Sequence, residues 1–474
     1  MYLKKLHISN FRCFRNYTIE FAPGVTVLFG KNGSGKSTLI HALHKALSFA
    51  FKNDKTDKDA ISLSSGFQSL KPTPFHRNED IVRDEKTGLP LTFIEIQAEA
   101  YFLGEELNWR MFASTTSFAL QSSKYKDAYR KLMDEIKKTG VLPVFAYFSD
   151  SFPHVSIKAS TLTKAQLSLR NLGYLGWDNE TAYSDLWIRR LTQTWTMWSR
   201  ARDNVARESL ALANCEKNKA SGIVNEEEYR EDVELHEARL ANAQKEFAKY
   251  DPEVFAIRNC LVNFSKKLPG IDVIDIFVSV YAEAGLCLDT KDGMNPAFEK
   301  LPSGYKRIFY MTLDIAYRSF ILNGSTASEG IVIIDEIDLH LHPALEQVVL
   351  QCFHETFPNV QFIVSTHSPL VLTGIETERM NNKIYKMTSD FEAPVECPNI
   401  HGIDYNQMLE ENMDVSKRKP EIQELFKKAW DEVAKKDIEA AKKTIGELES
   451  KTPADQIELV QLRAILERIE LIGK

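Results

Sequence analysis

The stretch Gly30-Lys31-Asn32-Gly33-Ser34-Gly35-Lys36-Ser37 decides the fold of this chain. It matches every fixed position of the phosphate-binding pattern Gly-x-x-x-x-Gly-Lys-Ser. In such a loop the glycines let successive backbone N–H groups converge on an anion at the amino end of a helix. Lys36 then reaches the terminal phosphates and Ser37 ligates magnesium, so we expect residues 30–38, including Thr38, to surround nucleotide phosphates.

The residues beside the loop supply the strand and the helix that a phosphate-binding loop needs. Val25 to Phe29 is an apolar run between Pro23-Gly24 and Gly30, which predicts a buried strand. Ser37 to Phe51 carries apolar residues at helical spacing. The alternative interpretation of the glycines, a hairpin turn between two strands, does not fit a helix that begins directly after the loop.

A second pair of strand ends, roughly 300 residues downstream, carries acidic and polar side chains. The β-branched run that starts at Ile331 predicts a buried strand, and Asp335 and Glu336 follow it. Asp335 can hold magnesium and Glu336 can orient an attacking water, although two acids standing alone would also mark a solvated strand end. His367 follows the strand predicted at Val360 to Ser365 and can contact the terminal phosphate or that water, although an isolated histidine there is more often a surface residue.

The segment Leu301-Pro302-Ser303-Gly304 precedes a helical pattern that runs from Ser303 to Leu322. The amino end of that helix would offer its N–H groups and its dipole to an anion. Taken alone, Ser303 fits a helix cap without any ligand equally well.

Composition bounds the class of protein. The chain has 474 residues, 43% hydrophobic and 26% charged, which is enough for a large core and for more than one domain. The net charge of -7 gives no overall basic signal, so nucleic acid would have to be contacted through a local patch or a partner. Six scattered cysteines without a C-x-x-C pair predict reduced thiols in the cytoplasm, and no apolar stretch is long enough to span a membrane. A membrane exporter subunit could also lack such a stretch.

The pattern of elements predicts an α/β fold with a mostly parallel core sheet, an antiparallel β lobe, a helical-hairpin insertion and a helical carboxyl-terminal tail. The hairpin is expected over residues 181–248, broken at Ser221-Gly222, as an arm of roughly 50 Å at most. We divide the chain into an amino-terminal lobe at 1–160, the helical insertion at 161–265, a carboxyl-terminal lobe at 266–395 and a helical region at 396–474.

Together these segments resemble the ABC-type ATPase heads of the Rad50, RecF, SMC and overcoming-lysogenization-defect groups. The resemblance covers most of residues 1–375 and begins at Asn10-Phe11-Arg12-Cys13-Phe14 before the phosphate loop, or Walker A motif. It continues with Leu301 to Gly304 as the signature and Asp335-Glu336 as Walker B. Asp338 then stands in the D-loop position, and His367 is the switch residue.

The resemblance implies a site that one chain cannot complete. Two heads would sandwich two ATP molecules with Mg²⁺, Arg12 would join the residues at the phosphates, and Ser303 and Gly304 of one head would complete the site of the other. Hydrolysis would then be a property of a dimer. Pro302 stands where the family usually has serine, which implies slow turnover if Ser303 does not replace the missing hydroxyl. The Q-loop glutamine is not located, because Gln97 lies within a predicted strand.

A narrower resemblance points to the ATPase subunits of Septu-type antiphage systems, which also occur beside some retrons. It rests on the segments Leu142 to Tyr147, Trp195 to Trp198, Leu301 to Arg307, Ile337 to Pro343 and Met413 to Arg418. Such subunits lack a nuclease domain and work with a separate HNH nuclease. After His367 the sequence has neither the Glu and Asp-x-Asp pattern of a Toprim nuclease nor a His-Asn-His arrangement, so we expect cleavage to reside in a partner.

The charged helical region after Lys417 has two interpretations. It can be a helical cap on the ATPase core, or it can be a docking surface for a nuclease or for higher oligomers, with exposed leucines as the indication.

The sequence therefore favours a cytoplasmic defence ATPase that forms a dimer or larger assembly and controls a partner nuclease. A DNA-repair clamp like RecF or Rad50, which binds duplex DNA directly, is disfavoured by the short arm and the acidic net charge. A transporter ATPase is disfavoured by the arm and by the segment from Asn10 to Phe14.

Overall fold

The computed structural model describes residues 1–52, 71–84, 86–149, 170–177, 184–279, 285–376, 381–397, 400, 402–404, 407–413, 418–453 and 455–472. Residues 53–70 and the middle of the segment from Met413 to Arg418 lie outside these residues. Two compact units are present, Met1–His401 and Gly402–Lys474. The four-part division of the sequence stays a prediction.

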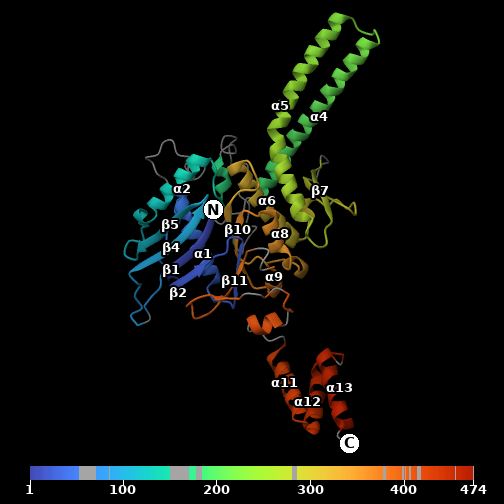
Figure 1. Ribbon diagram of the computed structural model, residues 1–474. Coiled ribbons are helices and arrows are strands. Elements are labelled where there is room, and N and C mark those ends of the chain that lie inside the picture. Colours follow the sequence, from blue (N-terminus) through green and yellow to red (C-terminus); the bar gives the residue numbers. More distant parts are fainter. Residues whose placement is uncertain are drawn as a thin grey trace. The chain divides into compact units, whose positions relative to one another are not determined.

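A six-stranded sheet forms the centre of the first unit (Figure 1), in the order β12-β11-β3-β10-β9-β6. Five neighbouring strands run parallel and β12 pairs antiparallel at one edge, which confirms the mostly parallel core. The strands are β3 (Val25–Gly30), β6 (Val144–Phe148), β9 (Gly330–Ile334), β10 (Val360–Thr366), β11 (Lys383–Met387) and β12 (Val395–Glu396).

An antiparallel sheet of four strands, in the order β2-β1-β4-β5, forms the predicted β lobe. Alternate side chains of β4 are buried along its whole length, as expected for a sheet with one face on the core. The strands are β1 (Tyr2–Phe11), β2 (Phe14–Glu20), β4 (Phe93–Phe102) and β5 (Glu105–Ser114), and α2 (Lys126–Thr139) contacts β5.

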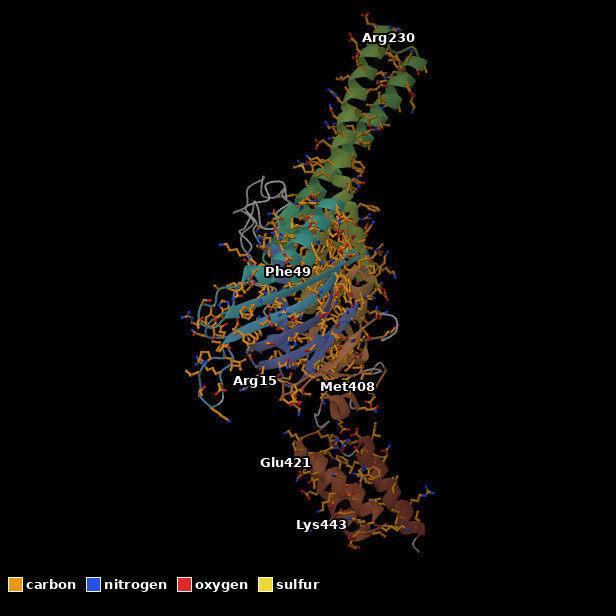
Figure 2. The ribbon with its side chains drawn as sticks, turned by 60° about the vertical axis from the view of Figure 1, so that its left-hand side comes forward. Arg15, Phe49, Arg230, Met408, Glu421 and Lys443 are labelled. Carbon is orange, nitrogen blue, oxygen red and sulfur yellow. The ribbon has the colours of Figure 1, made fainter. Side chains whose placement is uncertain are left out.

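The helix after the phosphate loop is shorter than its apolar spacing predicts. Helix α1 spans Lys36–Leu47, and a 3-10 turn follows at Ser48–Phe51. The Ser48 hydroxyl donates to the Lys45 carbonyl oxygen at 2.6 Å, a local bond that competes with helix continuation. Phe49, labelled in Figure 2, stacks on Trp109 of β5 with ring centroids 4.0 Å apart, so packing against the lobe fixes the turn.

His44 on α1 gives a pH-dependent prediction. It is fully buried, its Nε2 donates to the Trp177 carbonyl oxygen at 2.5 Å, and burial lowers its pKa from 6.5 to about 4. The unfolded chain binds this proton more tightly than the folded chain does. The contribution of His44 to the free energy of unfolding is therefore fully present above pH 6.5, and roughly 3 kcal/mol of it is lost as the pH falls toward 4. Urea unfolding between pH 4 and 7 checks this. In His44→Gln the free energy of unfolding should fall less between pH 7 and 4, by that same amount. Equal pH dependence in the variant and the wild type would contradict the lowered pKa of His44.

The predicted helical hairpin is confirmed and projects from the head as an arm, with Arg230 near its far end (Figure 2). Helix α4 spans Ser184–Ala220 and α5 spans Glu226–Ser265, and Asn225 begins α5 with a capping box. Helix α5 continues through Pro252 past the expected end at residue 248. The reason is tertiary packing, since Phe264 contacts Phe309 and Phe353 in the head.

The root of the arm is fixed to α6 (Ser303–Asn323), the helix that begins at the signature segment. Trp187 of α4 stacks on Tyr317 of α6, and its Nε1 donates to Asp314 Oδ1 at 2.6 Å. Arg318 forms an ion pair with the same carboxylate. Further elements of this unit are β7 (Val273–Val278), β8 (Leu286–Thr290), α7 (Pro343–Glu346), α8 (Val349–Thr356) and α9 (Pro369–Thr373).

The second unit contains the helices α11 (Pro420–Ala434), α12 (Ile438–Lys451) and α13 (Ile457–Ile472), which carry their own hydrophobic core. Leu448, Leu459 and Leu462 are fully buried in that core, so these leucines do not provide the exposed surface expected from the sequence. The exposed apolar side chains lie on α13 instead, at Ile457, Val460, Ile465 and Leu471. Within the described residues, no helix is both long enough and apolar enough to cross a bilayer.

Candidate functional site

The sheet brings the two distant halves of the site to one edge. Strand β10 pairs parallel with β3 on one side and with β9 on the other, so their carboxyl ends lie together. The phosphate loop follows β3, Asp335 and Glu336 follow β9, and His367 follows β10. The roughly 300 residues between the halves are therefore bridged by strand pairing.

The phosphate loop has a backbone that needs its glycines. Gly33 and Gly35 have φ of 79° and 93°, in the left-handed region. A Cβ at Gly35 would lie 2.8 Å from the Phe14 ring, and one at Gly30 would lie 2.5 Å from the Met387 carbonyl oxygen. The loop is thus packed between the β1–β2 turn and the end of β11.

Lys36 is held inside this loop. Its Nζ donates to the carbonyl oxygens of Gly30 at 2.9 Å and Lys31 at 3.1 Å, and the residue is 5% exposed. Burial lowers the pKa of Lys36, while the charges of Asp335, Glu336 and Asp338 raise it. The ammonium group is therefore largely desolvated and lies in the field of the downstream acids, where an anion would be bound strongly.

The residues present fit a magnesium nucleotide. Among the described residues, none provides a hydrogen-bond partner for the buried Ser34 hydroxyl, which suits a loop that closes on an oxygen-rich anion. Ser37, Asn32 and Gly33 are exposed and Thr38 is half-buried, so this side of the loop is accessible. The Ser37 hydroxyl and the Asp335 carboxylate are the hard oxygen donors that Mg²⁺ prefers.

Ser365 connects the two acids to the neighbouring strand, a role that the sequence prediction missed. Its hydroxyl donates to the Asp335 carboxylate and accepts from the Glu336 backbone N–H at 2.9 Å. Glu336 has a φ of 51°, rare for a residue with a side chain, so this bond helps to hold a strained conformation. The only sequence signal was a polar residue at the end of an otherwise buried apolar strand.

We expect Ser365→Ala to lower the turnover number for ATP about tenfold, because Asp335 and Glu336 lose their shared orienting group. The Michaelis constant should change little, since the phosphate loop is untouched. Steady-state phosphate release checks this, with Ser365→Thr as the variant that keeps the hydroxyl. If Ser365→Ala had the same turnover number for ATP as the wild type, Ser365 would have no role in orienting Asp335 and Glu336.

The D-loop and switch positions meet in the same chain. Asp338 Oδ1 accepts from the Thr366 hydroxyl at 2.6 Å and from the His367 backbone N–H at 3.2 Å. His367 Nε2 lies 3.9 Å from Glu336 Oε1, and both side chains are about one-third exposed. Glu336 and His367 are therefore close together and accessible to water.

The signature segment is built against the D-loop of its own chain. Pro302 is the N-cap of α6 without a side-chain cap bond, and Ser303 is the first helical residue and is exposed, so Ser303 is not the helix cap. Gly304 is buried, and a Cβ there would lie 2.7 Å from the His340 carbonyl oxygen. Arg307 donates to the Glu336 carbonyl oxygen at 3.0 Å and so links α6 to Walker B.

Arg12 stands in the β1–β2 turn with a φ of 51°. Its Nε donates to Asp80 Oδ1 at 2.9 Å, and its side chain is 23% exposed. Its neighbours Cys13 and Phe14 touch the phosphate loop, since a Cβ at Gly35 would lie 3.3 Å from the Cys13 sulfur. Arg12 is thus placed beside the loop and is partly accessible.

Comparisons with known proteins agree with this geometry. An AAA domain family matches residues 5–253, more than half of the chain, and an AAA ATPase domain family matches residues 177–372. The retron Vc95 probable ATPase of Vibrio cholerae serotype O1 biovar El Tor is 24% identical over 85% of this chain and 82% of its own length. The retron Ec83 probable ATPase of Escherichia coli is 26% identical over 88% of this chain and 77% of its own length.

A shorter match extends over part of the head. The Septu protein PtuA of Bacillus mycoides is 40% identical over 83 residues, which are 16% of this chain and 11% of its own length. The fold, the site and these matches agree with the resemblance drawn from the motifs. The chain belongs to the AAA domain family and is an SMC/Rad50-like ABC-type ATPase head.

Proposed function

We propose that this chain is the ATP-hydrolysing subunit of a bacterial antiphage defence complex in the cytoplasm. Two copies close around two ATP molecules, and the nucleotide state controls a separate HNH nuclease. The dimer is inferred from one observation: Ser303 is exposed at the amino end of α6, while its neighbour Gly304 packs against the segment that follows Asp338. The defence role rests on the similarity to retron and Septu ATPases.

Each residue of the site has a role in hydrolysis. The backbone N–H groups of residues 30–38 and the Lys36 ammonium bind the phosphates, with Arg12 beside them. Bound Mg²⁺, held by Ser37 and Asp335, would supply charge neutralisation at the phosphates. Glu336 orients the attacking water, and His367, 3.9 Å away, contacts the water or the terminal phosphate.

The second chain completes this site with its signature. Ser303 and Gly304 of the partner head direct the positive end of α6 at the terminal phosphate, where charge develops during transfer. Pro302 occupies the position where the family usually has serine, so the signature hydroxyl has to come from Ser303, one residue later, and we expect slow turnover. Asp338, bonded to Thr366 and His367, transmits closure of the two heads to the switch residue.

We place the nuclease contact on α13 of the second unit, which carries the exposed side chains Ile457 (76%) and Leu471 (77%). Ile457→Asp with Leu471→Asp should abolish co-elution with the HNH nuclease, because burying either charge at an interface is costly. Size-exclusion chromatography of the mixed proteins checks this. Ile223→Asp, at the arm turn and 70% exposed, is the matched control and should still co-elute.

The direct test of this function has two measurements. ATP hydrolysis by the purified chain should depend on protein concentration, because the site needs two heads, and the HNH nuclease should co-elute with the wild-type chain at micromolar concentration. Hydrolysis with a rate per chain independent of concentration across the dimerisation range, or clean separation of the two proteins, would contradict the proposal.

A second candidate function is direct binding of duplex DNA, as in a repair ATPase of the RecF or Rad50 kind. One observation favours it. A pocket of about 450 Å³ between α4 and α5 is lined by three arginines and two glutamates, which gives it a small local excess of positive charge on an acidic chain. These residues are Arg200, Arg207, Arg239, Glu208 and Glu246. ATP-dependent binding of duplex DNA that weakens steeply with salt would support it, and the same low affinity with or without ATP would exclude it.

A further inference from the structure

A buried ion cluster joins the turn before the phosphate loop to the helix after it. The Asp80 carboxylate is fully buried. Its Oδ1 lies 2.9 Å from Arg12 Nε, and its Oδ2 lies 3.1 Å from Lys45 Nζ. Arg12 belongs to the β1–β2 turn and Lys45 to α1, so one carboxylate connects the two elements that flank Gly30 to Lys36.

Asp80 holds Arg12 by its backbone as well as by its side chain. The Arg12 N–H donates to the Asp80 carbonyl oxygen at 3.1 Å, while Arg12 keeps its left-handed φ of 51°. Asp80 is itself fixed, because the His76 backbone N–H donates to its Oδ2 at 2.8 Å. The next residue, Ile81, also forms an isolated antiparallel β-bridge with Phe11 of β1. Neither the backbone nor the Nε edge of Arg12 is therefore free to reorient.

The electrostatics of the cluster keep the Asp80 carboxylate charged. Burial would raise the pKa of Asp80, but Lys45 and the bonds from His76 and Arg12 outweigh it and lower that pKa, so the carboxylate stays ionised. The exposed Glu79 carboxylate lies 3.9 Å from Arg12 Nη2, so two carboxylates face the two cations and only Asp80 is buried between them. Burying an ion pair contributes little net stability by itself, so stability alone is a weak reason for this arrangement.

We propose that Asp80 is a positioning residue that presents Arg12 to the phosphates of the bound nucleotide. This rests on the proposed function, in which Arg12 is one of the ATP-binding residues. The turn that carries Arg12 touches the loop, since Cys13 and Phe14 lie within 3.3 Å of the position of a Cβ at Gly35. With its Nε edge bound to Asp80, the guanidinium can direct its terminal N–H groups to the phosphates, with one of these nitrogens 3.9 Å from the exposed Glu79 carboxylate. Little entropy is then lost when the phosphates bind.

The variants separate positioning from stability. Asp80→Asn leaves Lys45 buried without its counter-ion, so it should lower both the unfolding temperature and the ATP affinity. The double variant Asp80→Asn with Lys45→Met removes both buried charges and should regain most of the lost thermal stability. Its affinity for a non-hydrolysable β,γ-imido ATP analogue with Mg²⁺ should nevertheless stay about tenfold below the wild type.

Two further variants complete the design, measured by calorimetric titration of the same analogue and by thermal unfolding. Arg12→Ala should weaken binding about tenfold, and adding Asp80→Asn to it should weaken binding no further. Lys45→Met alone should bind like the wild type. In steady-state assays the positioning variants should raise the Michaelis constant for ATP and leave the turnover number nearly unchanged.

The outcomes distinguish this proposal from the proposed function. If the wild-type chain does not bind the analogue, the proposed function itself is contradicted. If the wild type binds but the Asp80→Asn, Lys45→Met double variant binds equally well, Asp80 serves the fold alone and the positioning role is wrong. The same holds if Asp80→Asn weakens binding as strongly in the Arg12→Ala background as in the wild type.

Discussion

Replacing Lys36 by alanine is expected to weaken ATP binding on the order of a hundredfold, about 2.7 kcal/mol. The reason is geometric and electrostatic. The Lys36 ammonium is held by two loop carbonyls and is largely desolvated, so its attraction for a phosphate is little screened by water. Calorimetric titration with ATP and Mg²⁺ measures the loss.

Lys31→Ala is the matched control for this variant, because the Lys31 side chain is exposed on the same loop and Lys31 serves the site through its backbone. Its affinity should remain within about threefold of the wild type. Thermal unfolding should show that both variants are folded, since removing Lys36 also removes the desolvation cost of its charge. Equal affinities of Lys36→Ala and wild type would exclude a phosphate-binding role for Lys36.

Glu336→Gln should keep ATP binding and lower hydrolysis by about two to three orders of magnitude. The amide keeps the shape and the backbone bonds to Ser365 and Arg307, but it cannot accept the proton of the attacking water. ATP is then bound and not consumed, so the two-headed state accumulates. Light scattering with ATP should give a mass of at least twice the 54.1 kDa chain.

The control for Glu336→Gln is Glu355→Gln, which removes a carboxylate on α8 that pairs with Lys267. That variant should hydrolyse ATP like the wild type. Wild-type hydrolysis by Glu336→Gln would show that another group orients the water. Retained binding without any ATP-dependent change in mass would leave the catalytic role intact and contradict the closed dimer.

The site was predictable where local sequence dictates local structure. The glycines of the phosphate loop, the β-branched run before Asp335 and the polar cluster after β10 each specify a short segment whose backbone follows from its own residues. Because these segments end parallel strands, their meeting at one sheet edge follows from the α/β alternation.

What the sequence did not predict depends on contacts between distant segments. Asp80 comes to Arg12 and Lys45 through packing, and no spacing rule connects the three. The early end of α1 follows from the stacking of Phe49 on Trp109, and the continuation of α5 through Pro252 follows from its packing on the head. In each case contacts between distant segments override the local conformational preference. Such contacts cannot be inferred from the spacing of residues in a single sequence.

The expected exposure of Leu448, Leu459 and Leu462 in the second unit was wrong for a related reason. Helical spacing alone does not tell an apolar stripe that faces a partner from one that faces a neighbouring helix. Leu459 and Leu462 pack with α11 and α12, whereas Ile457 and Leu471 of the same helix remain exposed.

The central claim is that the ATP site is shared between two chains, and mixing two inactive variants tests it most directly. Lys36→Ala lacks a working phosphate loop but keeps its signature. Ser303→Asp keeps the loop but directs a negative charge at the partner's phosphates, and an acid at the first turn of α6 does not weaken that helix. Each variant alone should be nearly inactive. Mixed in equal amounts they should recover up to about a quarter of wild-type hydrolysis, since about half of the dimers then hold one intact composite site. No recovery in a mixture shown by light scattering to contain dimers would contradict the shared site.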